Sequence, residues 1–228
     1  LVYEVIEPRT IKLTFGKDAS GNDLKPGYTF TDANISAFKF QLTNGESFDM
    51  GVIGAMITDN GRSIHVLTSV PFNSDCTVSK DENTRLGVFM WLAPGVKDMN
   101  DKDVIITGKK LVTDKLNAEQ ISTARDTNNS GRIILTFSED VKYADALVSS
   151  SANSIMASGI DVKDSNGNTL IPIVDYTVSL SGRYLTITVS SSKKGDMSVT
   201  LIRPEFLTDN AGNAVIPLGT QVVRDVNE

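Results

Sequence analysis

The sequence predicts an all-β fold made of two antiparallel β-sandwich domains in tandem, and three observations support this prediction. Apolar and polar residues alternate with a period of two in many short segments, the pattern of strands with one buried face. Such segments recur roughly every 8–12 residues with turn residues between them, as in antiparallel sandwiches. The first half of the chain also recurs in the second half, at an offset of 122 residues. Because no long segment has a period of 3.6, we expect less than about a tenth of the chain to be helical.

The repeat is clearest in the opening strand of each half. Residues 131–141 read GRIILTFSEDV, in which apolar side chains alternate with polar ones. Residues 11–15 read IKLTF, the same pattern 122 positions earlier. A slip of one residue would turn a strand inside out, so a register that keeps the inward faces in phase favours one domain used twice. The core positions predicted from these strands and from the later strand around residues 185–189 are Leu13, Phe15, Leu135, Phe137, Leu185 and Ile187.

Further strands and turns follow in the same order in both halves. Asn-Gly, a dipeptide favoured in tight hairpins, occurs at 44–45 and again at 166–167. Val78 aligns with Val199 at offset 121, and Val104 aligns with Val215 at offset 111. The change in offset predicts that the first domain contains about ten additional residues.

The domain boundaries follow from this alignment. We predict a first domain over residues 1–112 with an insertion near 82–92, a linker over 113–130 and a second domain over 131–228. The predicted linker is polar, and its residues between Leu116 and Ile121 fit a last strand or a short bridging helix. A structureless linker of this length would be unusual, so we expect it to be partly ordered.

Composition excludes several classes of function. The net charge of −6 and the pI near 4.9 argue against a nucleic-acid partner, which would need clustered Lys and Arg. No apolar run reaches the roughly 18 residues that a membrane span requires, so no membrane insertion is expected. Cys76 is the single cysteine, which excludes an internal disulfide. Composition leaves the cellular compartment open.

The sequence offers little for catalysis, and we predict that the chain is not an enzyme. His65 is the single histidine and falls on the polar side of a strand, where solvation explains it. Cys76 aligns with Met197 and fits a small core residue. No serine lies in a nucleophile elbow, and no glycine-rich turn leads from a strand into a helix. Trp91 lies in the apolar segment 86–92, where it either packs in the core or is partly exposed to a neighbour.

Loops rich in Asp and Asn are the best chemical candidates, because calcium binds six to eight oxygen ligands of the kind these loops supply. The strongest candidate is the crowded segment that contains Asp98, Asn100, Asp101 and Asp103. The other clusters are Asp18, Ser20, Asn22 and Asp23; Asp164, Asn166 and Asn168; and Asp209, Asn210 and Asn213. Asp and Asn also prevail in hairpin turns for backbone reasons, and this second explanation stays open.

The second half resembles the bacterial immunoglobulin-like modules of surface-layer (S-layer) proteins and related exported cell-surface proteins. The segments that support this resemblance are 135–141 (LTFSEDV), 181–187 (SGRYLTI), 195–199 (GDMSV) and 207–213 (LTDNAGN). The first half matches more weakly, through the internal repeat. The resemblance implies two immunoglobulin-like β-sandwiches and favours calcium-dependent assembly.

Three functions remain in view. The resemblance implies a structural, non-catalytic segment of a secreted protein at the bacterial cell surface or S-layer, where it contributes to a lattice or acts as a spacer. Its partners would be neighbouring domains of the same longer chain and copies of itself. The alternatives are an adhesin or carbohydrate-binding module of a larger secreted protein, and an accessory domain of a secreted hydrolase. An exposed aromatic platform would favour the carbohydrate-binding alternative.

Overall fold

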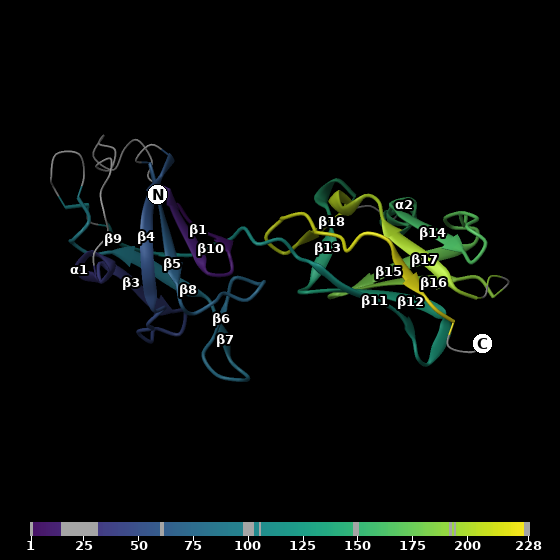
Figure 1. Cartoon of the computed structure of the whole chain (residues 1–228), viewed down its shortest axis with the longest axis horizontal. Helices are drawn as coiled ribbons and strands as arrows, with labels where there is room; N and C mark the ends of the chain where they lie inside the picture. The colour runs from purple at the N-terminus through teal and green to yellow at the C-terminus, as the bar shows by residue number, and fades with distance from the viewer. Residues whose placement is uncertain are drawn as a thin grey trace. The chain divides into compact units, whose positions relative to one another are not determined.

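The computed structural model of the chain describes residues 2–14, 32–59, 62–97, 103–104, 106–147, 151–191, 193 and 195–225. The chain divides into two compact units, Leu1–Leu116 and Asn117–Glu228 (Figure 1). Both units consist mainly of antiparallel strands with short helical segments, which confirms the predicted all-β fold class. Among the described residues, no helix has the length and apolar character needed to cross a membrane.

Unit 1 contains two main sheets. The larger sheet has the order β10-β1-β2-β5-β4, the smaller has the order β3-β8-β9, and β6 and β7 form a separate short pair. The strands are β1 (Val2–Glu7), β2 (Thr10–Thr14), β3 (Phe38–Leu42), β4 (Val52–Thr58), β5 (Ser63–Thr68), β6 (Val78–Ser79), β7 (Arg85–Leu86), β8 (Val88–Leu92), β9 (Ile106–Leu111) and β10 (Thr113–Asp114), and the short helix α1 covers Asp32–Ile35.

Unit 2 has the same plan. Its sheets have the orders β11-β12-β16-β15 and β14-β17-β19, with β13 and β18 paired separately. The elements are β11 (Gln120–Asp126), β12 (Asn129–Phe137), β13 (Val141–Tyr143), η2 (Asp145–Leu147), α2 (Ala152–Ser158), β14 (Ile160–Asp164), β15 (Tyr176–Ser181), β16 (Tyr184–Val189), β17 (Met197–Leu201), η3 (Pro204–Phe206), β18 (Leu207–Asp209) and β19 (Gln221–Val223).

The strand order of both units is that of an immunoglobulin constant domain. In that fold, the first, second, fifth and fourth strands form one sheet, and the third, sixth and seventh form the other. Unit 2 reproduces this with β11-β12-β16-β15 and β14-β17-β19. Unit 1 reproduces it with β1-β2-β5-β4 and β3-β8-β9, and adds β10 in parallel beside β1. The two units are therefore immunoglobulin-like sandwiches.

Each unit has its own apolar core between its two sheets. In unit 2, Leu135 on β12 lies opposite Leu185 on β16, and both side chains are fully buried. In unit 1, Leu13 on β2 lies opposite Ile64 on β5, also fully buried. Of the predicted core positions, the structure confirms burial of Leu13, Leu135, Phe137, Leu185 and Ile187. The sixth, Phe15, lies outside the described residues.

In the immunoglobulin strand order, the position of the sixth strand of unit 1 is taken by β8. Here the structure corrects the sequence alignment. Met90 on β8 pairs with Phe40 on β3, as Val199 on β17 pairs with Val162 on β14. The residue equivalent to Val199 is therefore Met90 and not Val78. Both segments alternate apolar and polar residues, so the period alone gave two possible registers, and pairing with the third strand distinguishes them.

The insertion in unit 1 consequently lies earlier than the predicted position near 82–92. Nineteen residues, 69–87, separate β5 from β8, whereas seven, 190–196, separate β16 from β17. The additional residues of unit 1 include the β6–β7 pair and Cys76, which is buried but is not the equivalent of Met197. The apolar segment that contains Trp91 forms β8, the sixth strand in the immunoglobulin order, and is not part of the insertion.

Residues 113–130, predicted as a linker, contribute strands to both units. Strand β10 pairs with β1 in unit 1, and β11 pairs with β12 in unit 2. Gln120 is the one buried position of β11, and the other side chains of this strand are partly or fully exposed. An edge strand with so few inward apolar residues has no hydrophobic alternation, which is why the sequence pattern did not reveal it.

Two buried tyrosines, one in each unit, differ in how their hydroxyl groups are satisfied. Tyr3 is 1% exposed, and its hydroxyl has no hydrogen-bond partner among the described residues. The hydroxyl of Tyr176 lies 2.8 Å from the carbonyl oxygen of Ala157 and 2.6 Å from that of Ile160. Burial raises the pKa of both phenols to about 12, and the Asp161 carboxylate adds to this rise for Tyr176.

We expect Phe137→Ala to lower the free energy of unfolding of unit 2 by about 3–5 kcal/mol, since a fully buried aromatic ring is replaced by a cavity. The measurement is chemical denaturation of the parent and the variant. Tyr184→Ala, which changes a ring that is 49% exposed, is the matched control and should cost far less. Equal losses for the two variants would show that Phe137 does not lie in the core.

The two tyrosines should respond in opposite directions to removal of the hydroxyl. Tyr3→Phe should raise the free energy of unfolding by about 1–3 kcal/mol, because a buried unpaired hydroxyl costs that much. Tyr176→Phe should lower it by about 1 kcal/mol, because a hydrogen bond to the carbonyls is lost. Denaturation of both variants tests the pair, and destabilisation by Tyr3→Phe would show that its hydroxyl has a partner.

Candidate functional site

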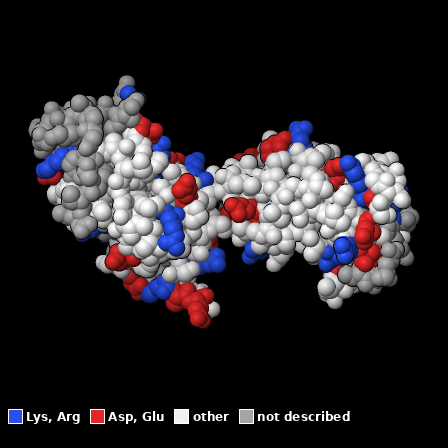
Figure 2. All heavy atoms as spheres, in the orientation of Figure 1, with Lys and Arg blue, Asp and Glu red and all other residues white. Residues whose placement is uncertain are grey.

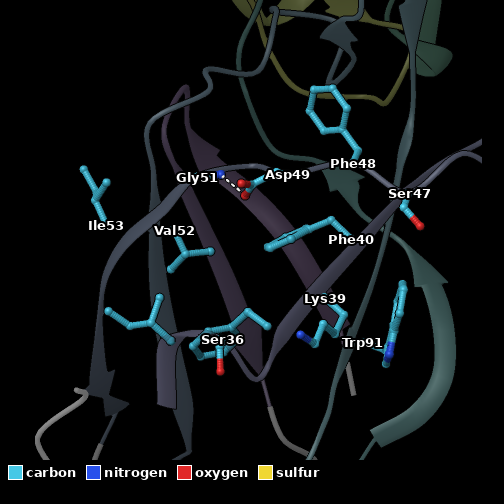
Figure 3. Close-up of a pocket in the computed structure, with 12 residues that line it drawn as sticks. Ser36, Lys39, Phe40, Ser47, Phe48, Asp49, Gly51, Val52, Ile53 and Trp91 are labelled. Atoms are coloured by element: carbon cyan, nitrogen blue, oxygen red, sulfur yellow. Dashed lines mark hydrogen bonds between the residues drawn. The ribbon is translucent and has the colours of Figure 1, made fainter. Parts of the chain in front are cut away.

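A groove opens along one side of unit 1, where β4 ends one sheet and β3 ends the other. It encloses about 900 Å³, and Figure 3 shows side chains from β3, β4 and β8 turned toward it. The residues that line it are Ile35, Ser36, Phe38, Lys39, Phe40, Ser47, Phe48, Asp49, Gly51, Val52, Ile53 and Trp91.

The turn that leads into β4 sets one wall of this groove. The Asp49 carboxylate accepts a hydrogen bond of 2.8 Å from the backbone N–H of Gly51 (Figure 3). Gly51 has a φ of +58°, and a Cβ atom there would lie 2.0 Å from the Ser69 hydroxyl oxygen, so no larger residue fits without movement. The turn delivers Val52 and Ile53 to the groove, with Ile53 60% exposed.

Unit 2 closes the same side of its sandwich with helix α2. This helix contacts β14 and β15, and its Met156 and Ala157 are buried in the core of unit 2. At the 122-residue offset, Asn34 of α1 takes the place of Met156. The Asn34 amide donates a hydrogen bond of 2.7 Å to the carbonyl of Gly95 instead of filling the core. The counterpart of α2 in unit 1 is the shorter α1, which covers Asp32–Ile35 and contacts β4, and the groove opens beside it.

Trp91 lines the groove from the outward side of β8, where its ring is partly exposed. The Lys109 ammonium lies 4.8 Å from the centre of the indole ring and donates a hydrogen bond of 2.7 Å to the Gln41 side-chain oxygen. Such a contact stabilises the ring through the negative face of its π system. Of the two readings left open by the sequence, the structure supports partial exposure.

His65 and Cys76, the remaining candidates for catalysis, lie in unremarkable surroundings. His65 is partly exposed on β5, opposite Lys12 on one side and Met56 on the other. Cys76 is 7% exposed, with its thiol 3.8 Å from the Val112 carbonyl oxygen. Neither lies in a set of nucleophile, base and orienting group among the described residues.

An apolar loop, residues 171–174, projects from unit 2 between β14 and β15. Ile171, Ile173 and Val174 are 58%, 59% and 71% exposed. Ile173 has a φ of +71°, a left-handed conformation that is strained for a β-branched residue. Such strain costs on the order of 1–3 kcal/mol and persists only where the surrounding structure imposes it.

Asp175 holds the apolar loop in this conformation. Its carboxylate accepts a hydrogen bond of 2.8 Å from the N–H of Ile171, and its own N–H donates one of 2.8 Å to the Ile171 carbonyl. The N–H of Ile173 donates to the Tyr176 carbonyl at 2.8 Å, and the Lys193 ammonium lies 3.7 Å from the Asp175 carboxylate. The loop therefore presents its apolar side chains on a fixed backbone.

Two of the predicted calcium loops are closed hairpin turns. The Asp164 carboxylate accepts hydrogen bonds from the N–H groups of Asn166 and Asn168, at 2.9 Å each, and from the Asn168 amide at 3.0 Å. These hydrogen bonds, the one from the Asn168 side chain first, lower the pKa of Asp164. The Asp209 carboxylate likewise accepts from the N–H and the amide of Asn213, at 2.8 Å each. Their oxygens accept hydrogen bonds from backbone and side-chain groups within the turn, as the alternative explanation expects.

The strongest calcium candidate lies mostly outside the described residues. Of its four members, the structure describes Asp103 alone. The Lys97 ammonium lies 2.8 Å from the Asp103 carboxylate, which also accepts a hydrogen bond of 3.1 Å from the N–H of Gly95. The hydrogen bond from Lys97 lowers the pKa of Asp103. Asp98, Asn100 and Asp101 lie outside the described residues, so calcium binding there stays a prediction.

No family model matches the chain, and no curated protein matches its sequence. The N-terminal part of the bacterial S-layer protein SbsC is 13% identical, with a TM-score of 0.37, covering 99% of this chain and 43% of that one. A structure of native alpha-2-macroglobulin from Escherichia coli that spans domains MG0-NIE-MG1 is 10% identical (TM-score 0.34; 98% of this chain and 70% of that one covered). The BSP domain of a biofilm associated protein is 12% identical (TM-score 0.25; 100% and 30% covered). The chain spans less than half the length of the first of these structures, and TM-scores this low leave function to be argued from its own residues.

If the segment from Asp98 to Asp103 binds calcium, the ion should raise the melting temperature of unit 1, because it binds the folded form. The measurement is a melting titration with calcium, with magnesium as the control ion. Asp103→Asn should reduce the shift, and Asp145→Asn, at an exposed site on η2, should leave it unchanged. Equal shifts in the parent and Asp103→Asn would exclude this carboxylate as a ligand.

Proposed function

We propose that the chain is a structural, non-catalytic segment of a bacterial S-layer or other cell-surface protein, in which two immunoglobulin-like modules serve as lattice or spacer elements. The observation that supports this most directly is that carboxylates form hydrogen bonds within turns, while large apolar side chains are exposed to solvent. The Asp164 and Asp209 carboxylates close turns, whereas large apolar side chains stand exposed on β4 and on the apolar loop. Contact surfaces, and not a polar pocket, are what an assembly module needs.

The partners proposed are neighbouring domains of the same longer chain and copies of itself. On the face drawn in Figure 2, basic and acidic side chains are interspersed and do not gather into a large patch of one sign. This face does not favour a polyanion such as nucleic acid. Secretion and location at the cell surface follow from the sequence resemblance, which covers most of residues 131–223, and form part of the proposal.

The test is immunogold electron microscopy of intact cells with antibodies raised against residues 1–228. We expect label on the outer surface, and removal of the epitope by protease added to intact cells. Label confined to the cell interior would overturn the surface location. Hydrolysis of a cell-wall polysaccharide by residues 1–228 alone would overturn the non-catalytic assignment.

A carbohydrate-binding module is the second candidate, and the groove of unit 1 favours it. Trp91 and Phe48 both line this groove, and aromatic side chains with one apolar face and one polar partner are frequent in binding sites. Titration calorimetry with cell-wall polysaccharides separates the two functions. Binding that Trp91→Ala abolishes would support a carbohydrate-binding module, and no heat of binding would leave the structural proposal in place.

A further inference from the structure

Strand β4 of unit 1 is an edge strand. Within the described residues, the sheet order gives it one strand neighbour, β5. Among these residues, the backbone groups on its other side have no strand partner, which is the arrangement that lets a sheet edge pair with another strand. An irregularity between Val52 and Gly54 interrupts the register with β5, so the regular part of the edge is the segment 54–58.

The composition of β4 does not protect this edge. Its seven residues, VIGAMIT, include no charged residue and no proline. Ile53 and Met56 are each 60% exposed. Natural sheets usually block an edge with lysine, proline or an inward-pointing charge, and uncharged segments of high β propensity without proline are prone to pair with other strands.

The equivalent strand of unit 2 shows how this fold protects the same edge. The outward positions of β15 are polar: Thr177, Ser179 and Ser181. Pro172 forms a parallel bridge with Tyr176 at the start of β15, and α2 packs against the strand. In unit 1 the four-residue α1 contacts β4 in the corresponding position, but it is shorter than the seven-residue α2. Of the two edge strands, the one with large exposed apolar side chains is thus that of unit 1.

From this contrast we propose that β4 is a strand-pairing interface, and that its partner is β4 of a second copy of this chain. The inference rests on the proposed function as an assembly module and names one of its contacts. Two copies with a net charge of −6 repel each other wherever acidic surfaces meet. The uncharged β4 edge is free of this repulsion. Antiparallel pairing about a two-fold axis uses the same strand on both sides, as most homodimers do.

The geometry of the edge defines the register of the pair. Met56 is the centre of the regular segment 54–58. Full overlap of two such segments around a two-fold axis places Met56 of one copy opposite Met56 of the other, with Gly54 opposite Thr58. Met56 lies on the outer face of its sheet, next to His65 and away from the core of unit 1. The two larger sheets would join into one continuous sheet, with backbone hydrogen bonds supplying the affinity.

The experiment is sedimentation velocity of residues 1–228 over a wide concentration range, for the parent and for Met56→Lys. The variant places two ammonium groups opposite each other in the pair, and we expect the dissociation constant of the dimer to rise at least about tenfold. Because Met56 is exposed, the monomer should keep its fold, which thermal melting checks. Met56→Leu, which keeps the side chain apolar, should dimerise like the parent.

Thr177→Lys is the matched control, since it adds the same charge to the equivalent edge strand of unit 2. It should leave the dimer intact, and loss of the dimer in both lysine variants would overturn the proposal as a general charge effect. Hydrogen exchange gives a second readout: amides of the segment 54–58 should exchange more slowly at high protein concentration in the parent and not in Met56→Lys.

A parent chain that stays monomeric at all concentrations, with exchange in β4 independent of concentration, would overturn the pairing. That result would leave the surface location of the protein, measured by immunogold labelling, unaffected. Conversely, a dimer of β4 strands in a protein found inside the cell would overturn the proposed function and not the interface. The two proposals can therefore fail separately.

Discussion

The register between the second and fifth strands of each sandwich is the constraint on which the rest of the structure depends. In unit 2, Ile133 faces Ile187 and Leu135 faces Leu185, and all four side chains are fully buried. Because successive side chains of a strand point to opposite faces, a slip of one residue would move all of them to the solvent. The fourth strand pairs with the other side of the fifth, at the edge of its sheet. The core therefore positions β4 and β15 alike, and their edges differ in the residues that they expose.

The sequence predicts the strands that have a strong inward face and fails where that signal is weak or ambiguous. The opening strands and their buried positions follow directly from the alternation in residues 11–15 and 131–137. The sixth strand of unit 1 does not, because Val78 and Met90 both lie in alternating segments and only pairing with Phe40 identifies Met90. Such pairing is non-local, and the period of the sequence contains no information on it. The same limit applies to β11, a largely polar strand that pairs with β12.

The groove of unit 1 could not be predicted, because it arises from small differences between two copies of one fold. Met156 fills the core of unit 2, whereas the equivalent Asn34 turns to the carbonyl of Gly95. At a second contact, Gly159 of unit 2 lies against the Phe206 ring: a Cβ on this glycine would come within 2.8 Å of it. In the equivalent contact of unit 1, Ala37 takes the place of Gly159 and Gly95 takes the place of Phe206. The glycine therefore belongs to the other partner of the contact. Each sequence difference is minor. Only the positions of these residues in space show that this side of the sandwich is closed in unit 2 and open in unit 1.

The apolar loop of unit 2 adds a separate argument for contact surfaces. A glycine at position 173 would relieve the left-handed strain, and a polar residue at 174 would remove the most exposed apolar side chain of the loop. The chain has neither, although both costs reduce its stability. Asp175 instead fixes the loop through hydrogen bonds to Ile171, so little conformational entropy remains to be lost when another surface covers it. Strain and exposed apolar area kept together on a fixed backbone are difficult to explain in an isolated domain, and a contact made by these side chains would offset both.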